Sequence, residues 1–181
     1  MKIIKPEIQG LVILEPDVFS DDRGYFFESY NYSSYLVAGI HDAFVQDNEA
    51  QSKKGVLRGL HYQVGELAQS KLVRVIQGAV YDVVVDIREG SPTHGKWYGI
   101  ELSAQNKKQF YIPRGFAHGY LSLEERTILS YKCDNFYSRA HEGGIRYDDP
   151  LLGIKWPIDG ILAIVSERDL GLPAFGSHRL P

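Results

Sequence analysis

Three side chains that can move or hold charge, Arg58, His61 and Lys71, occur close together within two otherwise apolar segments. Burying so many polar groups among aliphatic ones costs several kcal/mol unless the groups are paired or used. The stretch therefore predicts a functional site built on a rigid sheet. The aliphatic residues around it are typical of strand core: Leu57, Leu60, Leu72, Val73, Val75 and Ile76.

His61 is the first choice for a general base, because a histidine with a pKa of about 6.5 can accept a proton at neutral pH. A single strand histidine is more often a core residue bonded to backbone. The neighbouring guanidinium and ammonium favour catalysis instead. On local grounds alone, Lys71 could equally be a lysine that extends from a strand end into water.

Three further fragments carry side chains that can transfer protons or hold charge. They are Pro113-Arg-Gly-Phe-Ala-His118-Gly-Tyr120, Tyr131-Lys-Cys-Asp-Asn-Phe-Tyr137 and Ser166-Glu-Arg-Asp169.

The composition indicates a soluble, cytoplasmic protein. The chain has 181 residues, 44% of them hydrophobic, which suits one domain over 1–181 with a sizeable core. The net charge of −3 gives no sign of a nucleic-acid surface, and the single cysteine, Cys133, excludes an intrachain disulfide. No window approaches the roughly 18 apolar residues of a membrane span, and the N-terminus lacks the apolar region of a signal peptide.

The dominant period of the chain is two, which predicts an all-β fold. Apolar runs over 71–88 are split at Gln77-Gly78, and further short strands are expected at 96–103, 110–112, 119–123 and 127–131. One helix is expected from Tyr32 to Ala38, capped by Asn31 and ended by Gly39. Many short strands at close spacing are typical of a sandwich or barrel, and a cupin-type jelly roll fits.

The motif Pro113-x-Gly-x-x-His118 matches the second cupin signature. The first signature needs His-x-His followed by Glu as metal ligands, but the chain has Gln63, with Leu67 or Ala68 at the glutamate position. Two histidines alone are a poor ligand set for a divalent ion. We therefore expect the barrel without a metal, and proton-transfer chemistry in its place.

Taken together, these fragments resemble the dTDP-4-dehydrorhamnose 3,5-epimerase family. The resemblance runs from Gly10-Leu-Val-Ile to Asp169, and its order and spacing make it specific. It also includes Asp22-Arg-Gly-Tyr-Phe-Phe-Glu28, Gln46-Asp-Asn48, Asp148-Asp-Pro-Leu-Leu and Trp156-Pro. The resemblance implies epimerisation of dTDP-4-keto-6-deoxy-D-glucose at carbons 3 and 5, without a cofactor, for rhamnose synthesis.

The resemblance also implies catalytic roles. Asp169 is the carboxylate partner of His61, Lys71 stabilises the enolate, and Tyr131 is the acid on the opposite face of the sugar. Tyr137 lines the sugar pocket.

The implied substrate-binding residues are mostly polar. Arg23 and Arg58 suit the diphosphate, because a guanidinium binds its oxygens in pairs. Phe26 or Phe27 could stack on the thymine. The remaining contacts expected from the resemblance are Glu28, Gln46, Asn48, His118, Glu142 and Arg168.

Three alternatives stay open. The nearest is a related epimerase that inverts a single carbon or acts on a different dTDP-keto-sugar. Phe136 and Ser138-Arg-Ala, which depart from the family pattern at the pocket-lining loop, leave the number of inverted carbons open. The others are a metal-dependent cupin and a non-catalytic binder of sugar nucleotides. A homodimer is expected from the resemblance and from the aromatic segment Tyr25–Tyr30, with Arg23 and Glu28 acting in the neighbouring subunit.

Overall fold

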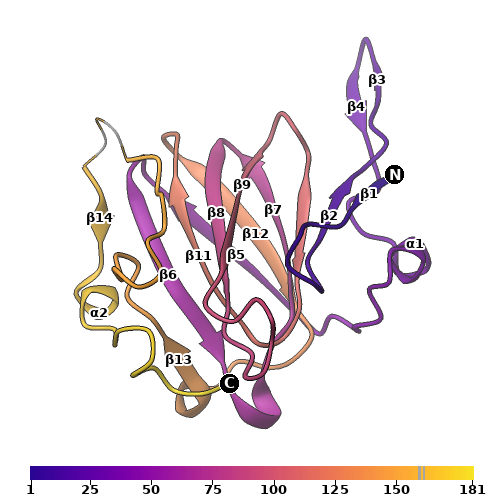
Figure 1. Ribbon diagram of the computed structural model, residues 1–181. Helices are drawn as coiled ribbons and strands as arrows, with labels where there is room; N and C mark the ends of the chain where they lie inside the picture. The colour runs from indigo at the N-terminus through magenta and orange to yellow at the C-terminus, as the bar shows by residue number, and fades with distance from the viewer. Residues whose placement is uncertain (159, 161) are drawn as a thin grey trace.

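Short β-strands make up most of the structure, as the period-two pattern predicts (Figure 1). The computed structural model describes residues 1–158, 160 and 162–181. Its strands are β1 (Lys2–Ile4), β2 (Val12–Glu15), β3 (Phe19–Asp21), β4 (Gly24–Phe26), β5 (Gln46–Ser52), β6 (Val56–Gln63), β7 (Lys71–Gln77), β8 (Ala79–Asp86), β9 (Trp97–Ser103), β10 (Gln109–Ile112), β11 (Phe116–Ser122), β12 (Thr127–Cys133), β13 (Glu142–Gly144) and β14 (Ile164–Val165). The helices are α1 (Tyr32–Val37) and α2 (Glu167–Leu170), with 3-10 turns η1 (Gly65–Leu67) and η2 (Arg139–His141).

In the described part of the chain the strands form two large sheets and one hairpin. The first sheet has the order β1-β2-β10-β7-β12-β5. The second has the order β13-β6-β11-β8-β9, with β14 pairing with β6. Two mainly antiparallel sheets that face each other around a shared core are the layout of a jelly-roll barrel, which confirms the expected fold class.

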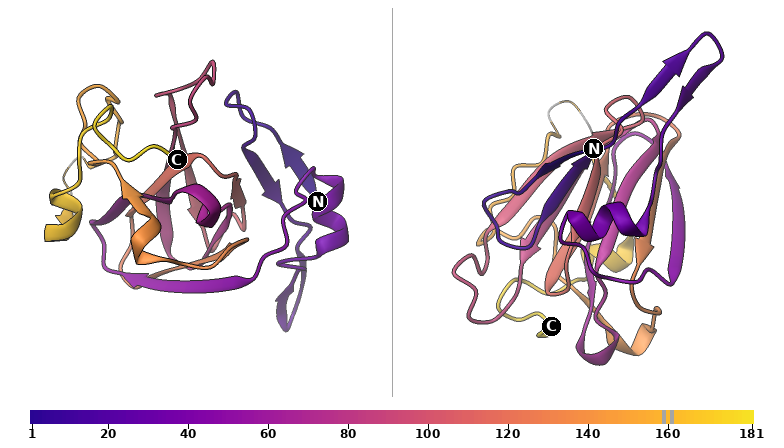
Figure 2. Two further views of the ribbon diagram at one scale, coloured as in Figure 1. Left: turned by 90° about the horizontal axis from the view of Figure 1, so that it is seen from below. Right: turned by 90° about the vertical axis from the view of Figure 1, so that its right-hand side faces the viewer.

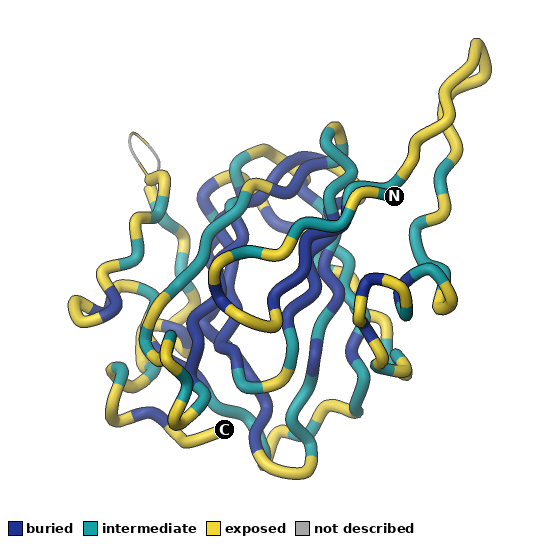
Figure 3. The backbone as a smooth tube through the Cα atoms, turned by 45° about the vertical axis from the view of Figure 1, so that its right-hand side comes forward, coloured by how far each residue is buried: buried dark blue, intermediate teal, exposed yellow. Residues whose placement is uncertain are grey.

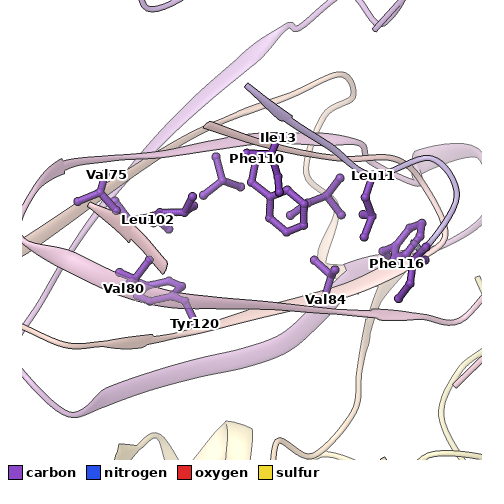
Figure 4. Packing of buried hydrophobic residues seen from close by; sticks show 13 residues of the cluster. Leu11, Ile13, Val75, Val80, Val84, Leu102, Phe110, Phe116 and Tyr120 are labelled. Atoms are coloured by element: carbon purple, nitrogen blue, oxygen red, sulfur yellow. The ribbon is translucent and has the colours of Figure 1, made fainter. Parts of the chain in front are cut away.

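The main core lies between the two sheets (Figure 4). Along β8, Val80 and Val84 point into this core, whereas Val83 and Val85 pack on the outer face of the second sheet. On β7, Val73 and Val75 point inward and Leu72 points outward. This alternation is the period of two expected of strands with two different faces.

Both outer faces are covered. Helix α1 packs Tyr35 and Ala38 against Leu72 and Tyr111 on the first sheet. The segment after β13, including Leu152, covers the second sheet, so the barrel strands are mostly buried (Figure 3).

The β3–β4 hairpin lies away from the barrel, on the opposite side from the C-terminal segment (Figures 1 and 2). Much of its apolar surface is open to solvent: Phe19 is 67% exposed, Tyr25 59% and Phe26 68%. Contiguous exposed apolar surface of this kind is uncommon on monomeric soluble proteins.

The expected helix is confirmed, since α1 begins after Asn31, whose side chain accepts hydrogen bonds from Ser33 N and Ser34 N. The strands expected after residue 70 are confirmed within a few residues. None of the described helices has the length and apolarity to cross a membrane.

Candidate active site

A bulge in β6 brings Arg58 and His61 to the same face of the sheet. Residues three apart on a regular strand point to opposite faces. Here His61 is opposite His118 and Arg58 is opposite Tyr120, so three steps on β6 match two on β11. The extra residue turns both side chains toward the barrel interior.

Gly59 makes this bulge possible. Its φ is +129°, and a Cβ added there would lie 2.5 Å from the Cα of Gly119 on β11. The two neighbouring strands therefore approach each other at a distance that only glycine permits.

His61 is held by Asp169, which comes from the short helix α2. The His61 Nε2 and Asp169 Oδ1 atoms are 2.7 Å apart, and Gly59 N donates to Asp169 Oδ2 over 3.3 Å. Burial acts to raise the pKa of Asp169, but the hydrogen bonds from His61 and Gly59 hold that pKa below its usual range. An ionised carboxylate can only accept, so the ring proton is fixed on Nε2 and Nδ1 keeps its lone pair.

Lys71 and Tyr131 lie on the facing wall, on β7 and β12 of the first sheet. The Lys71 Nζ is 5.8 Å from the centre of the Tyr131 ring, and among the described residues it forms no ion pair. Burial lowers the pKa of Lys71 and raises that of Tyr131 to about 12. The phenol is therefore protonated at neutral pH and can donate.

These groups meet in one cleft made of two adjoining cavities of about 280 and 270 Å³. His61, Lys71, Tyr131 and Arg168 line both cavities. The His61 side chain is 36% exposed, whereas that of Asp169 is 5% exposed, so the histidine faces the cleft and the carboxylate lies behind it.

The first cavity also receives Arg58 and His118. Among the residues that the structure describes, the Arg58 guanidinium is held by two long hydrogen bonds of 3.4 Å, to Ser52 Oγ and Gln51 O. It therefore keeps donors for an anion in the cleft.

The second cavity receives the remaining polar residues of the expected set. On β5, Gln46 and Asn48 share the inward face, and Gln46 Nε2 donates to Asn48 Oδ1 over 3.0 Å. At the rim, Arg168 forms an ion pair with Glu142, and Tyr137 is 53% exposed. Thus eleven of the fourteen expected site residues line the cleft: His61, Lys71, Tyr131, Asp169, Gln46, Asn48, Arg58, His118, Tyr137, Glu142 and Arg168.

Arg23, Phe26 and Glu28 do not line this cleft. Arg23 and Phe26 line a hollow on the β3–β4 hairpin, and Phe26 and Glu28 line another beside α1. The Arg23 side chain is 90% exposed and forms an ion pair with Asp21. Within one chain, these three residues are therefore separate from His61.

The side chains at the positions of cupin metal ligands form hydrogen bonds within the protein. The Nε2 atoms of His61 and His118 face Asp169 and Asp82, and Gln63 Oε1 accepts from Ser138 N over 2.9 Å. No group of three or more His, Cys, Asp or Glu side chains within the described residues could hold a metal ion. The residues present do not fit a cupin metal.

Asp82 is a residue of the site region that the sequence motifs do not single out. It is fully buried, and its two carboxylate oxygens lie 3.0 and 2.9 Å from His118 Nε2. A signal does exist in the strand pattern, because Asp82 occupies an inward position between Val80 and Val84, where an apolar residue is expected.

Comparison with known proteins adds family information to this geometry. Residues 5–177 match the family model described as dTDP-4-dehydrorhamnose 3,5-epimerase. A dTDP-4-dehydrorhamnose 3,5-epimerase of Salmonella typhimurium is 51% identical over 174 residues, which cover 96% of this chain and 94% of the relative.

Two solved structures are similar over nearly the whole chain. The dTDP-4-dehydrorhamnose 3,5-epimerase of Elizabethkingia anophelis has a TM-score of 0.92 and 51% identity, and covers 97% of both chains. A dTDP-6-deoxy-D-glucose-3,5-epimerase of Legionella pneumophila, in complex with dTDP-4-keto-L-rhamnose, has a TM-score of 0.93 and 47% identity, and covers 97% of this chain and 93% of the other.

Proposed function

The chain belongs to the dTDP-4-dehydrorhamnose 3,5-epimerase family of isomerases, and from this premise we propose the reaction and the role of each residue. The substrate is dTDP-4-keto-6-deoxy-D-glucose, and the product is dTDP-4-keto-L-rhamnose. The keto group at carbon 4 acidifies the protons at carbons 3 and 5. Each carbon is inverted by removal of its proton and return of a proton to the other face.

One observation supports this proposal most: a carboxylate-bound histidine faces a lysine and a tyrosine across one cleft. His61 belongs to the second sheet, and Lys71 and Tyr131 belong to the first. A substrate between the sheets would meet a base on one side and an acid on the other. Inversion at carbon requires this arrangement.

His61 acts as the base through Nδ1, because Asp169 accepts the proton on Nε2. When Nδ1 takes the substrate proton, the ring becomes a cation. The adjacent carboxylate, 2.7 Å from Nε2, stabilises that cation and keeps the ring in place.

Lys71 stabilises the enolate. Proton removal moves negative charge onto the oxygen at carbon 4, and a fixed ammonium beside that oxygen lowers the energy of the charge. The lack of an ion pair to Lys71 among the described residues supports this role, since its charge is available to the substrate.

Tyr131 returns the proton. With a pKa of about 12, the phenol carries its proton in the resting enzyme and is a donor without a charge of its own. After donation, proton exchange with water resets both groups for the second carbon.

The nucleotide part is held by polar groups of the cleft and by a second copy of the chain. Arg58 binds the diphosphate, while Gln46, Asn48, His118, Glu142 and Arg168 contact the sugar or the base, and Tyr137 lines the pocket. Arg23 and Phe26, from the hairpin, and Glu28, just after it, come from the partner in a homodimer. Their distance from the cleft of their own chain and the exposure of the hairpin support this arrangement.

No metal or other cofactor takes part in the proposed chemistry, because the substrate's own ketone supplies the acidity. We expect turnover to be unchanged after dialysis against EDTA. Loss of activity on chelation, restored by a divalent ion, would contradict this.

The test is incubation of the protein with dTDP-4-keto-6-deoxy-D-glucose in deuterium oxide, followed by proton NMR. The proposal expects deuterium at carbons 3 and 5 together with the L-rhamno configuration. Inversion at one carbon alone would indicate the single-carbon epimerase. Binding without exchange would indicate a non-catalytic protein and overturn the proposal.

A further inference from the structure

A buried carboxylate lies in the barrel where the strand pattern expects an apolar side chain. Asp82 points inward from β8 between two core valines, and it is fully buried. A carboxylate in such a position is costly unless it is paired. Its only hydrogen-bond partner in the described part of the chain is His118, through Nε2.

The pairing with His118 does not by itself explain why the strand carries a carboxylate at this position. A histidine can hydrogen-bond to a neutral acceptor equally well, and a buried pair of this kind is weak evidence for stability. The His118–Asp82 pair lies beside the His61–Asp169 pair, because His118 is the cross-strand partner of His61. The His61–Asp169 pair faces the reacting atoms, whereas Asp82 lies beneath the floor of the cleft.

On the other side of the cleft, Lys71 forms no ion pair with the described residues. Its side chain points inward from β7, in the same alternation as Val73 and Val75. Lys71 lines the same cavity as His118, the partner of Asp82. Burial acts to lower the pKa of Lys71, and Cys133 and then Asp82 act to raise it.

The other titratable groups around Lys71 do not supply the negative charge. From α2 and β13, Asp169 is paired with His61, and Glu142 is paired with Arg168.

From β12, Tyr131 and Cys133 are neutral at neutral pH, because burial raises the pKa of both. From β6, Arg58 adds a second positive charge to the same cavity. Among the described residues, Asp82 is left as the buried carboxylate inside the barrel that pairs with no lysine or arginine and contacts His118 instead.

We propose that Asp82 is a positioning residue that acts as the buried counter-charge of Lys71. Its carboxylate keeps the lysine side chain in the ammonium form and orients His118 in the floor of the cleft, without touching the substrate. The inference rests on the proposed function only for the use made of the ammonium, which is to hold the enolate.

The direct test measures the charge of Lys71 without any substrate. Lysines labelled with ¹³C and ¹⁵N are followed by NMR as a function of pH, and the Lys71 signal is assigned by its absence in Lys71→Arg. In Asp82→Asn we expect the Lys71 titration to move down by about one pH unit or more, the size expected for loss of a nearby opposite charge.

Asp86→Asn is the matched control. Asp86 is also fully buried on β8, but its partners are Arg88, Ser91 and Thr93 at the far end of the strand. The control should leave the Lys71 titration as in the wild type. Equal titration of Lys71 in Asp82→Asn and Asp86→Asn would overturn the proposal.

Activity provides a second measurement. Since the ammonium form is the active one, kcat falls as pH rises through the Lys71 pKa. In Asp82→Asn this alkaline fall should occur at lower pH, while the acid limb stays in place. A uniform loss of kcat at every pH would indicate a purely structural role and overturn the proposal.

Two measurements guard against misfolding. The double variant Asp82→Leu/His118→Phe replaces the pair by apolar groups, a change that tends to preserve folding. It should show the same downward shift. In the wild type itself, a Lys71 that loses its proton below about pH 7 would overturn the proposal. If the wild type neither exchanges nor inverts the sugar nucleotide, the proposed function fails, and the titrations still decide the role of Asp82.

Discussion

The proposed chemistry depends first on the two nitrogens of His61. Asp169 engages one of them over 2.7 Å, and the other is left for the substrate. The carboxylate has no other side-chain partner among the described residues, so its low pKa derives largely from this histidine and from Gly59 N. The tautomer and the orientation of the ring are therefore set by the same contact.

We expect His61→Ala to lose about 10²–10⁴-fold in kcat, the usual contribution of a general base. Asp169→Asn should lose a large part of that, because an amide can stabilise the wrong tautomer and no longer stabilises the ring cation. Steady-state kinetics on the sugar nucleotide measures both variants, with Asp86→Asn as a control for loss of a buried carboxylate. Near-normal kcat in His61→Ala would mean that the base is a different residue.

Tyr131→Phe should separate proton exchange from inversion. The variant keeps His61 and Lys71, so the enolate still forms, and His61 can return a deuteron to the face that the proton left. In deuterium oxide we expect label in the substrate with much less inverted product, whereas the wild type shows both together. A parallel fall of exchange and inversion would make Tyr131 a binding residue. If neither fell, Tyr137 would be the next acid to test.

At the scale of elements, the close approach of the neighbouring strands β6 and β11 at Gly59 sets the geometry of the cleft. The bulge at Gly59 lets Arg58 and His61 share one face, and Gly119 makes room for it on the neighbouring strand. The same bulge places Gly59 N against Asp169, so one backbone feature serves two contacts of the site.

Gly59→Ala should therefore be far more harmful than a glycine substitution elsewhere with the same backbone angle. Gly24 is the control, because its φ is +128° and nothing lies within 4 Å of its added Cβ. Both variants carry the backbone strain of about 1–3 kcal/mol, but only Gly59→Ala adds an overlap worth about 1–3 kcal/mol or more. Urea unfolding measures the free energy of unfolding of both variants. Equal losses would show that the close approach of Gly59 to Gly119 does not contribute to stability.

At the scale of the whole molecule, the cleft of one chain lacks the residues expected to bind part of the nucleotide. The hairpin that carries Arg23 and Phe26 extends away from the barrel of its own chain (Figures 1 and 3). Its aromatic side chains are largely exposed. A second copy could use this surface, and the proposed homodimer would then contain two composite sites.

Mixing two inactive variants tests this arrangement. If Arg23 acts in the partner's site, a heterodimer of His61→Ala and Arg23→Ala contains one cleft with both residues intact. Random pairing gives half heterodimers, so roughly a quarter of wild-type activity should return after the variants are unfolded and refolded together. The separately refolded variants, combined without exchange, are the control. Absence of any gain would place Arg23 in the site of its own chain or outside the site altogether.

The sequence alone determined the fold class and most of the site. A period of two requires strands with one buried face, and this pattern predicts most of the strands from β6 to β12. The unusual chemistry of Arg58, His61 and Lys71 inside apolar segments indicated where the site lies, and the family motifs extended it to residues in other segments.

Tertiary structure decided what local pattern could not. Asp169 is 108 positions from His61, and no periodicity encodes that contact. The alternation of a regular strand places Arg58 and His61 on opposite faces, and only the bulge against Gly119 reverses this. Asp82 is an irregular polar residue in its strand, but its link to His118 depends on the pairing of β8 with β11. Contacts between strands distant in sequence arise from the packing of the whole barrel. These contacts could therefore be assigned only from the folded structure.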